Sequence, residues 1–125
     1  MNVVDSSGWL EYLADGPNAG FVAPAIEKPR DLVVPTVSVY EVFKRVLQQR
    51  DHGAALQAIA VMRQGRVLEL TEALAIAAAR LSVKHALPMA DSIMLAATEA
   101  SDATLWTQDA DFKGVPHVRY IATKV

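Results

Sequence analysis

Short apolar runs alternate with longer amphipathic segments along the whole chain. Runs of two to five residues, rich in valine, leucine and aromatic side chains, occur at residues 3–4, 32–34, 66–70, 104–107 and 118–121. The first run is too close to the chain start to follow a helix, and the second ends at Pro35. The continuous apolar runs at residues 3–4 and 32–34 are typical of strands that are buried on both faces. The pattern therefore predicts four to five strands, of which these two are buried.

Helical periodicity fills most of the chain between these runs. It predicts a first helix between the serines at 6–7 and the Asp-Gly-Pro stop at 15–17, and further helices over residues 18–26, 38–50, 51–64, 72–85 and 89–100. Pro24 weakens the prediction for the second of these helices, because proline lacks the backbone N–H that a helix interior uses.

Polar residues at the predicted helix starts act as capping candidates. Ser6 and Ser7 offer hydroxyls at the start of the first helix, and Thr71 does so before residue 72. Ser38 and Glu41 match the S-x-x-E pattern of a capping box, in which each side chain bonds the backbone N–H of the other residue. We therefore expect the third helix to begin at Ser38.

Strands alternating with helices imply right-handed crossovers and a mostly parallel central sheet with helices on both faces. The predicted fold class is α/β, with one domain over residues 1–125. Within the fifth helix, residues 73–79 are apolar on nearly every side. We expect that segment to be buried on more than one face, against the sheet and with a second subunit as a further candidate.

Composition narrows the classes of protein and of chemistry. The chain has 52% hydrophobic residues and no low-complexity tract, so it should fold. Its apolar stretches are too short for a bilayer and it lacks a signal-peptide pattern, so we expect a cytoplasmic protein with no membrane partner. Cysteine is absent from the sequence, which excludes disulfides, thiolate metal sites and cysteine nucleophiles.

Acidic residues occupy the ends of predicted strands and the starts of predicted helices. Asp5 follows the first strand, Asp109 and Asp111 follow the fourth, and Glu41 and Asp91 lie in first helical turns. In a parallel sheet the carboxyl ends of strands share one edge, so Asp5, Glu41 and Asp109 can converge there. Asp91 needs a further assumption because its helix follows another helix. Each acid alone is also explained as a helix cap or a first-turn charge.

A pocket with four carboxylates needs a counter-charge. At about 5 Å and an effective dielectric constant of about 20, each close pair costs roughly 3 kcal/mol. Mg²⁺ or Mn²⁺ prefers oxygen ligands and would relieve that repulsion, and it can activate water for attack on a phosphate. The net charge of −2 argues weakly against nonspecific nucleic-acid binding, yet with four of the fourteen acids committed to a metal, ten acids face twelve bases.

Three segments carry a resemblance to a known family: VVDSSGWLEYL, VVPTVSVYEVFKRVL and LPMADSIMLAATEASDATLWTQDADF. With their spacing, they resemble the PIN-domain ribonucleases and, within them, the VapC-like toxins of toxin–antitoxin pairs. The resemblance implies an RNA-cleaving enzyme with an RNA substrate, a cognate antitoxin and a homodimer. Its implied acidic quartet, which would be catalytic and bind Mg²⁺ or Mn²⁺, is Asp5, Glu41, Asp91 and Asp109. Its implied supporting residues are Ser6, Ser7, Thr107 and Asp111.

Basic residues near these acids are candidates for contacts to substrate phosphates. Lys44 and Arg45 lie one helical turn beyond Glu41, and Lys113 follows the last acids. A solvated helix face or an ion pair explains them equally well. The three histidines show no metal-ligand spacing, so a catalytic histidine is not expected.

Three other functional hypotheses compete with that of an RNA-cleaving enzyme. An aspartyl-nucleophile phosphatase would carry a second acid two residues after Asp5, where Ser7 stands. A response-regulator receiver would carry a phospho-acceptor at a strand end near mid-chain, and none follows residues 66–70 in that way. A PIN-like module that only binds RNA or protein would tolerate the loss of acids, whereas all four candidates are present here.

Overall fold

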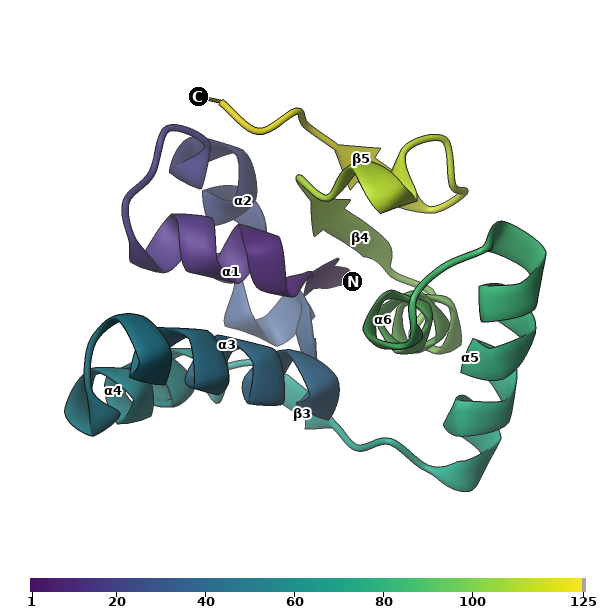
Figure 1. Cartoon of the computed structure of the whole chain (residues 1–125), viewed down its shortest axis with the longest axis horizontal. Helices are drawn as coiled ribbons and strands as arrows, with labels where there is room; N and C mark the ends of the chain where they lie inside the picture. The colour runs from purple at the N-terminus through teal and green to yellow at the C-terminus, as the bar shows by residue number, and fades with distance from the viewer. Residues whose placement is uncertain (125) are drawn as a thin grey trace.

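Five short strands form one sheet, and each of its pairings is parallel (Figure 1). In the computed structural model, which describes residues 1–124, the strands are β1 (Asn2–Val4), β2 (Leu32–Pro35), β3 (Arg66–Leu68), β4 (Thr104–Thr107) and β5 (Val118–Tyr120). Their order across the sheet is β3-β2-β1-β4-β5, so the first strand of the chain is the central one. The predicted α/β fold with a parallel sheet is confirmed.

Helices cover both faces of this sheet (Figure 1). They are α1 (Ser6–Leu13), α2 (Ala19–Ile26), α3 (Thr36–Gln49), α4 (His52–Met62), α5 (Glu72–His85) and α6 (Met89–Ala100), with short 3₁₀ helices η1 (Pro29–Asp31) and η2 (Ala110–Phe112). Side chains of α1 to α4 share one core with the sheet, while α6 and η2 share the other. Within residues 1–124, no helix is both long and apolar enough to cross a membrane.

Alternate residues of the central strands enter opposite cores. Val3 and Val33 pack in the core that includes α6, whereas Val4 and Val34 pack in the core of α1 to α4, and all four have no exposed surface. Because successive side chains of a strand point to opposite faces, burial on both faces requires an unbroken apolar run. This requirement explains why β1 and β2 could be predicted from the sequence.

The first helix begins on an acid and not on a serine. Asp5 is the N-cap of α1, and its Oδ1 accepts a hydrogen bond of 3.1 Å from the backbone N–H of Gly8. The predicted serine cap is therefore wrong, and Ser6 and Ser7 are the first helical residues. The reason is that β1 runs into α1 with only Asp5 between them, which leaves no linker to hold a serine in the capping position.

The predicted capping box of Ser38 and Glu41 is also wrong. Helix α3 begins at Thr36, directly after β2, so Ser38 lies inside its first turn. The Ser38 hydroxyl donates to the carbonyl oxygen of Pro35 at 2.7 Å instead of accepting from the helix. The prediction that Thr71 caps α5 is confirmed, since its Oγ1 accepts a hydrogen bond from the backbone N–H of Leu74 at 3.2 Å.

Helix α5 is an outer layer that packs mainly on α6 and reaches the sheet only at one edge, through Leu68 of β3 and its own Leu81 (Figure 1). Leu74 and Ala78 are buried against α6, whereas Ile76 is 48% exposed and Val83 is 87% exposed. The prediction that this helix is buried on more than one face, one of them against the sheet, is wrong for the single chain. Apolar periodicity shows that a helix has little polar surface, but it does not show which layer the helix joins.

A glycine allows α1 to lie close to the sheet, and its replacement provides a test of this packing. A Cβ at Gly8 would lie 2.8 Å from Cγ1 of Val4 and 3.1 Å from Cγ1 of Val22. We expect Gly8→Ala to lower the free energy of unfolding by about 1–3 kcal/mol, because overpacking displaces buried groups. Urea denaturation measures this difference.

Gly20 in α2 is the matched control, since a Cβ there would meet nothing within 4 Å. Gly20→Ala should leave the free energy of unfolding unchanged or raise it by up to about 1 kcal/mol, because alanine favours helix. Equal effects of the two substitutions would show that α1 does not depend on the small residue at position 8.

Candidate metal centre

Asp5 is fixed at the junction of β1 and α1 by three hydrogen bonds. Its Oδ1 accepts from Ser7 Oγ at 2.6 Å and from the Gly8 N–H, and its Oδ2 accepts from Thr107 Oγ1 at 2.6 Å. The side chain is 4% exposed. Burial raises the pKa of Asp5, and these hydrogen bonds oppose that rise because they stabilise the carboxylate. The donors therefore hold one orientation of a buried acid.

The end of β4 supplies the second part of the site. Thr107 is fully buried, and its Oγ1 donates to Asp5 while accepting from the backbone N–H of Asp109 at 2.9 Å. Asp109 then caps η2, since its Oδ1 accepts from the N–H of Asp111 at 2.9 Å. One hydroxyl thus connects the ends of two neighbouring strands, and the turn that follows carries two more acids.

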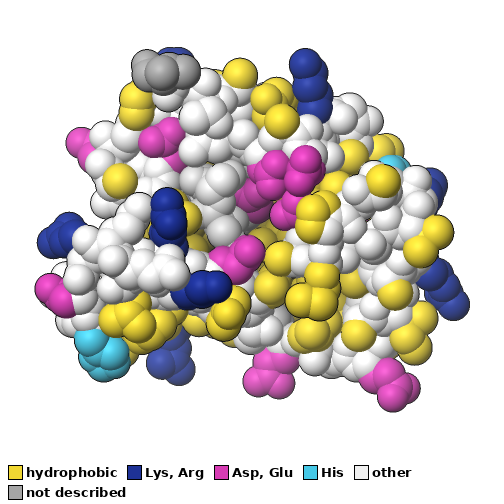
Figure 2. Space-filling model, in the orientation of Figure 1, with side chains coloured by type: hydrophobic (Ala, Val, Ile, Leu, Met, Phe, Trp, Pro, Cys, Tyr) yellow, Lys and Arg dark blue, Asp and Glu magenta, His cyan; other side chains and the backbone are white. Residues whose placement is uncertain are grey.

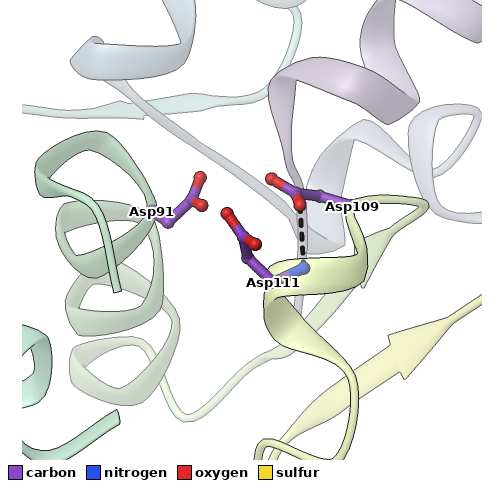
Figure 3. Close-up of side chains that lie close together, drawn as sticks. All are labelled: Asp91, Asp109 and Asp111. Atoms are coloured by element: carbon purple, nitrogen blue, oxygen red, sulfur yellow. Dashed lines mark hydrogen bonds between the residues drawn. The ribbon is translucent and has the colours of Figure 1, made fainter. Parts of the chain in front are cut away.

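Asp91, Asp109 and Asp111 bring their carboxylates together (Figure 3). Each offers one oxygen, and these oxygens lie within 4.8 Å of one another. Asp91 comes from the first turn of α6, and the other two come from η2 and its cap. The predicted convergence of Asp91 with Asp109 is present in this structure. We call these residues the three-acid cluster.

Burial and repulsion from neighbouring carboxylates raise the proton affinity of Asp91. Its pKa is raised to about 7, first by burial and then by the negative charges of Asp109 and Asp5. A carboxylate that resists ionisation in this way is one whose charge lacks a counter-charge. A divalent cation at the cluster would supply that counter-charge, so the donor set fits a hard metal ion.

Asp5 and Glu41 lie outside the three-acid cluster. Asp5 is near enough to raise the pKa of Asp91. Glu41 extends from α3, and its Oε1 accepts from Ser6 Oγ at 2.5 Å. Asp111, to which the sequence assigned only a supporting place, lies within the cluster because the 3₁₀ turn returns it toward Asp109. The roles of these acids stay predictions.

The smaller polar residues contact the acids as their positions suggested. Ser6 donates to Glu41, and both Ser7 and Thr107 donate to Asp5. Lys113 is an exposed residue directly after η2. Acidic side chains gather in the middle of one face of the molecule, with basic side chains nearby on the α3 side (Figure 2).

Sequence reasoning missed one element of the site, a pair of amide side chains. Gln108 donates from Nε2 to the carbonyl oxygen of Ser7 at 3.3 Å, and its Oε1 accepts from Nδ2 of Asn18 at 2.9 Å. Asn18 also donates to the carbonyl oxygen of Ala122 at 3.0 Å. The pair ties the end of β4 to the start of α1. The available signal was the position of Gln108 between two candidate site residues.

The family model described as PIN domain matches residues 3–118. A toxin–antitoxin complex from Klebsiella pneumoniae is similar in structure, with 16% identity over 95% of this chain and 96% of that chain and a TM-score of 0.81. Among curated protein sequences, none matches the chain.

Two further solved structures are similar. VapC20 of Mycobacterium tuberculosis, a sarcin-ricin loop cleaving toxin, has 20% identity over 93% of this chain and 95% of that chain, with a TM-score of 0.77. The DNA-bound VapBC of Salmonella typhimurium has 10% identity over 98% of this chain and 97% of that chain, with a TM-score of 0.74. At these identities the similarity establishes the fold.

The raised pKa of Asp91 predicts how the stability of the metal-free protein depends on pH. Between about pH 4 and pH 7 the unfolded chain loses the Asp91 proton while the folded chain keeps it, so folding becomes less favourable as pH rises. Asp91→Asn removes this penalty. Since water screens a half-exposed carboxylate, we expect the variant to gain about 2 kcal/mol over the wild type between pH 4 and pH 8.

Urea denaturation in EDTA at both pH values measures the gain. Asp31→Asn in η1 is the control, because Asp31 is an exposed acid outside the cluster. A stability difference between wild type and Asp91→Asn that is the same at pH 4 and pH 8 would contradict the raised pKa.

Proposed function

Because this chain belongs to the PIN domain family, we propose that it is a ribonuclease that hydrolyses RNA phosphodiester bonds with Mg²⁺ or Mn²⁺, as the toxin of a toxin–antitoxin pair. Membership follows from the family match over residues 3–118 and agrees with the resemblance read from the sequence. The observation that carries the proposal is the three-acid cluster, whose oxygens lie within 4.8 Å of one another.

The residues that would hold the metal are Asp91, Asp109 and Asp111, with Asp5 beside them. Among the described residues, Oδ2 of Asp5 accepts only from Thr107, which leaves that oxygen a lone pair for a cation or its water. All of these donors are carboxylate oxygens, which suits Mg²⁺ or Mn²⁺ better than softer metals. When bound, the ion would supply a Lewis acid that activates water and stabilises charge on the phosphate.

The chain contributes preorganisation to the proposed reaction. Asp5 is held by three donors and Glu41 by one, so neither has to find its orientation after the substrate binds. Glu41 is joined to α1 through Ser6 and not to the other acids. The proposal gives Glu41 the part of orienting the attacking water or accepting its proton.

The phosphatase alternative is disfavoured by the same contacts. That enzyme type would carry a second acid two residues after the nucleophile, whereas Ser7 stands there and donates to Oδ1 of Asp5 at 2.6 Å. The receiver alternative needs a phospho-acceptor at a strand end near mid-chain, but the acids gather around the ends of β1 and β4. A PIN-like module that only binds RNA or protein remains the alternative to be tested.

The proposed partners are an antitoxin and a second copy of the chain. Two of the similar structures are toxin–antitoxin assemblies from other organisms. A groove of about 480 Å³ between α1, α3 and α4 has apolar walls that include Leu10, Leu13 and Val61, which supports a protein partner there. The exposed Ile76 and Val83 of α5 support self-association. An RNA substrate would place the activity in the cytoplasm.

Cleavage of RNA by the purified chain tests the proposed chemistry. We expect cleavage with Mg²⁺ or Mn²⁺ and none with EDTA, and a loss of at least about 100-fold in Asp109→Asn and Asp91→Asn, because each removes a carboxylate from the cluster. Gel analysis of a labelled RNA measures the rates. Asp31→Asn should cleave like the wild type. Undiminished cleavage by Asp109→Asn, or cleavage in EDTA, would remove the cluster from the reaction.

Growth of cells that express the chain separates catalysis from binding. We expect the wild type to arrest growth and the quadruple variant D5N/E41Q/D91N/D109N to leave growth unchanged at equal protein level, because a toxin that acts by hydrolysis needs its acids. Growth curves with immunoblots measure both. Arrest by the quadruple variant would favour the binding module, since amide side chains keep the size of the acids they replace.

A further inference from the structure

One exposed aromatic side chain lies on α3 beside the proposed catalytic acids. Tyr40 is 63% exposed, so most of its aromatic ring is open to solvent. It directly precedes Glu41, and Nζ of Lys44, one turn further along the helix, lies 5.8 Å from the centroid of its ring. An aromatic face and a cation are thus presented together next to the site.

Two hollows connect this ring with the site. The first has a volume of about 240 Å³ and is lined by Tyr40, Glu41, Lys44, Arg45 and Gln48. The second, of about 310 Å³, has walls that include Ser7, Arg45 and Gln108. Arg45 lines both hollows. A strand of nucleic acid that passes from Ser7 toward Tyr40 would therefore meet the two consecutive cations of α3, Arg45 and Lys44.

We propose that Tyr40 is a nucleobase subsite on which one base next to the cleaved phosphate stacks, with Lys44 and Arg45 binding backbone phosphates beside that base. This inference rests on the proposed ribonuclease function and deepens it, because it makes single-stranded RNA the substrate class. Stacking on an aromatic side chain combined with a basic groove is the common way in which proteins hold single strands.

The surroundings of Tyr40 favour RNA over a protein partner. Apart from the ring itself, the hollow at Tyr40 is lined by polar and charged side chains, two cations and Glu41. The groove between α1, α3 and α4 is lined mainly by leucine, valine and alanine, with Gln49, Arg50 and Gln57 among them. A polyanion with flat bases matches the first surface, and an apolar segment of a protein matches the second. Self-association through Tyr40 becomes an outcome of the test.

Binding of a short unstructured RNA tests the subsite separately from cleavage. Fluorescence anisotropy with the D109N background in Mg²⁺ gives the Kd while the RNA stays intact. We expect Tyr40→Ala to weaken binding about tenfold and Tyr40→Phe by less than about twofold, because phenylalanine keeps the stacking face. Lys44→Gln should lower the slope of log K against log salt by about 0.7, while Arg80→Gln on α5 leaves it unchanged.

An abasic linker moved along the RNA identifies the stacked base. At one position the linker should weaken binding to the Tyr40 protein about tenfold and change binding to Tyr40→Ala by less than about twofold, which is the coupling that stacking requires. Equal effects of the linker on both proteins would overturn the subsite. So would an unchanged Kd for Tyr40→Ala, with or without a change in oligomeric state measured by sedimentation.

The outcomes separate the subsite from the enzyme. If Tyr40→Ala and the linker behave as expected but the wild type does not cleave with any divalent ion, the subsite stands and the ribonuclease proposal fails. If the wild type cleaves but the Kd of Tyr40→Ala and its KM for RNA are unchanged, the ribonuclease stands and the subsite fails. Absence of RNA binding by the wild type overturns both. Tyr40→Ala should unfold at the same temperature as the wild type, since the ring is exposed.

Discussion

The hydrogen bond between Thr107 and Asp5 is the contact on which the acidic site depends. It spans 102 positions of sequence, is 2.6 Å long, and lies at the place where two neighbouring parallel strands end. The Thr107 hydroxyl that orients Asp5 also accepts a hydrogen bond from the backbone N–H of Asp109. The position of one acid is thus set by the same atom that begins the turn carrying two others. Removal of that hydroxyl would leave a buried carboxylate without one of its donors, which is costly in any protein interior.

The acidic site destabilises the metal-free fold, and the buried core beneath the site offsets that cost. The site collects negative charge that weakens the metal-free fold, as the raised pKa of Asp91 shows. The scaffold beneath that carries these acids is an apolar core, in which Val3, Val33 and Phe112 have no exposed surface. Strain of this kind is typical of functional sites, where a favourable ligand interaction compensates for instability in its absence.

The sequence predicted the central strands because buried parallel strands need apolar runs, and it placed Asp5 near Asp109 because the carboxyl ends of such strands share an edge. The approach of Asp91 to Asp109 needed a further assumption, because α6 follows another helix. The rest depends on exact chain geometry. Whether Asp5 or a serine caps α1 is decided by a single residue of linker, and the place of Asp111 is decided by a 3₁₀ turn. The exposure of α5 depends on the layer that the helix joins, and the periodicity of its own sequence does not specify that layer.

The central place of β1 in the sheet has a consequence for synthesis on the ribosome. Its partner β4 and the acids after it are translated well after β1, which comes first among the five strands. A nascent chain that lacks residues 104–111 has neither Thr107 to orient Asp5 nor the two acids of η2, so a truncated product carries no assembled centre. Pairing of such distant segments is also slow to form in folding. The centre therefore cannot assemble on a nascent chain before residues 104–111 have been translated.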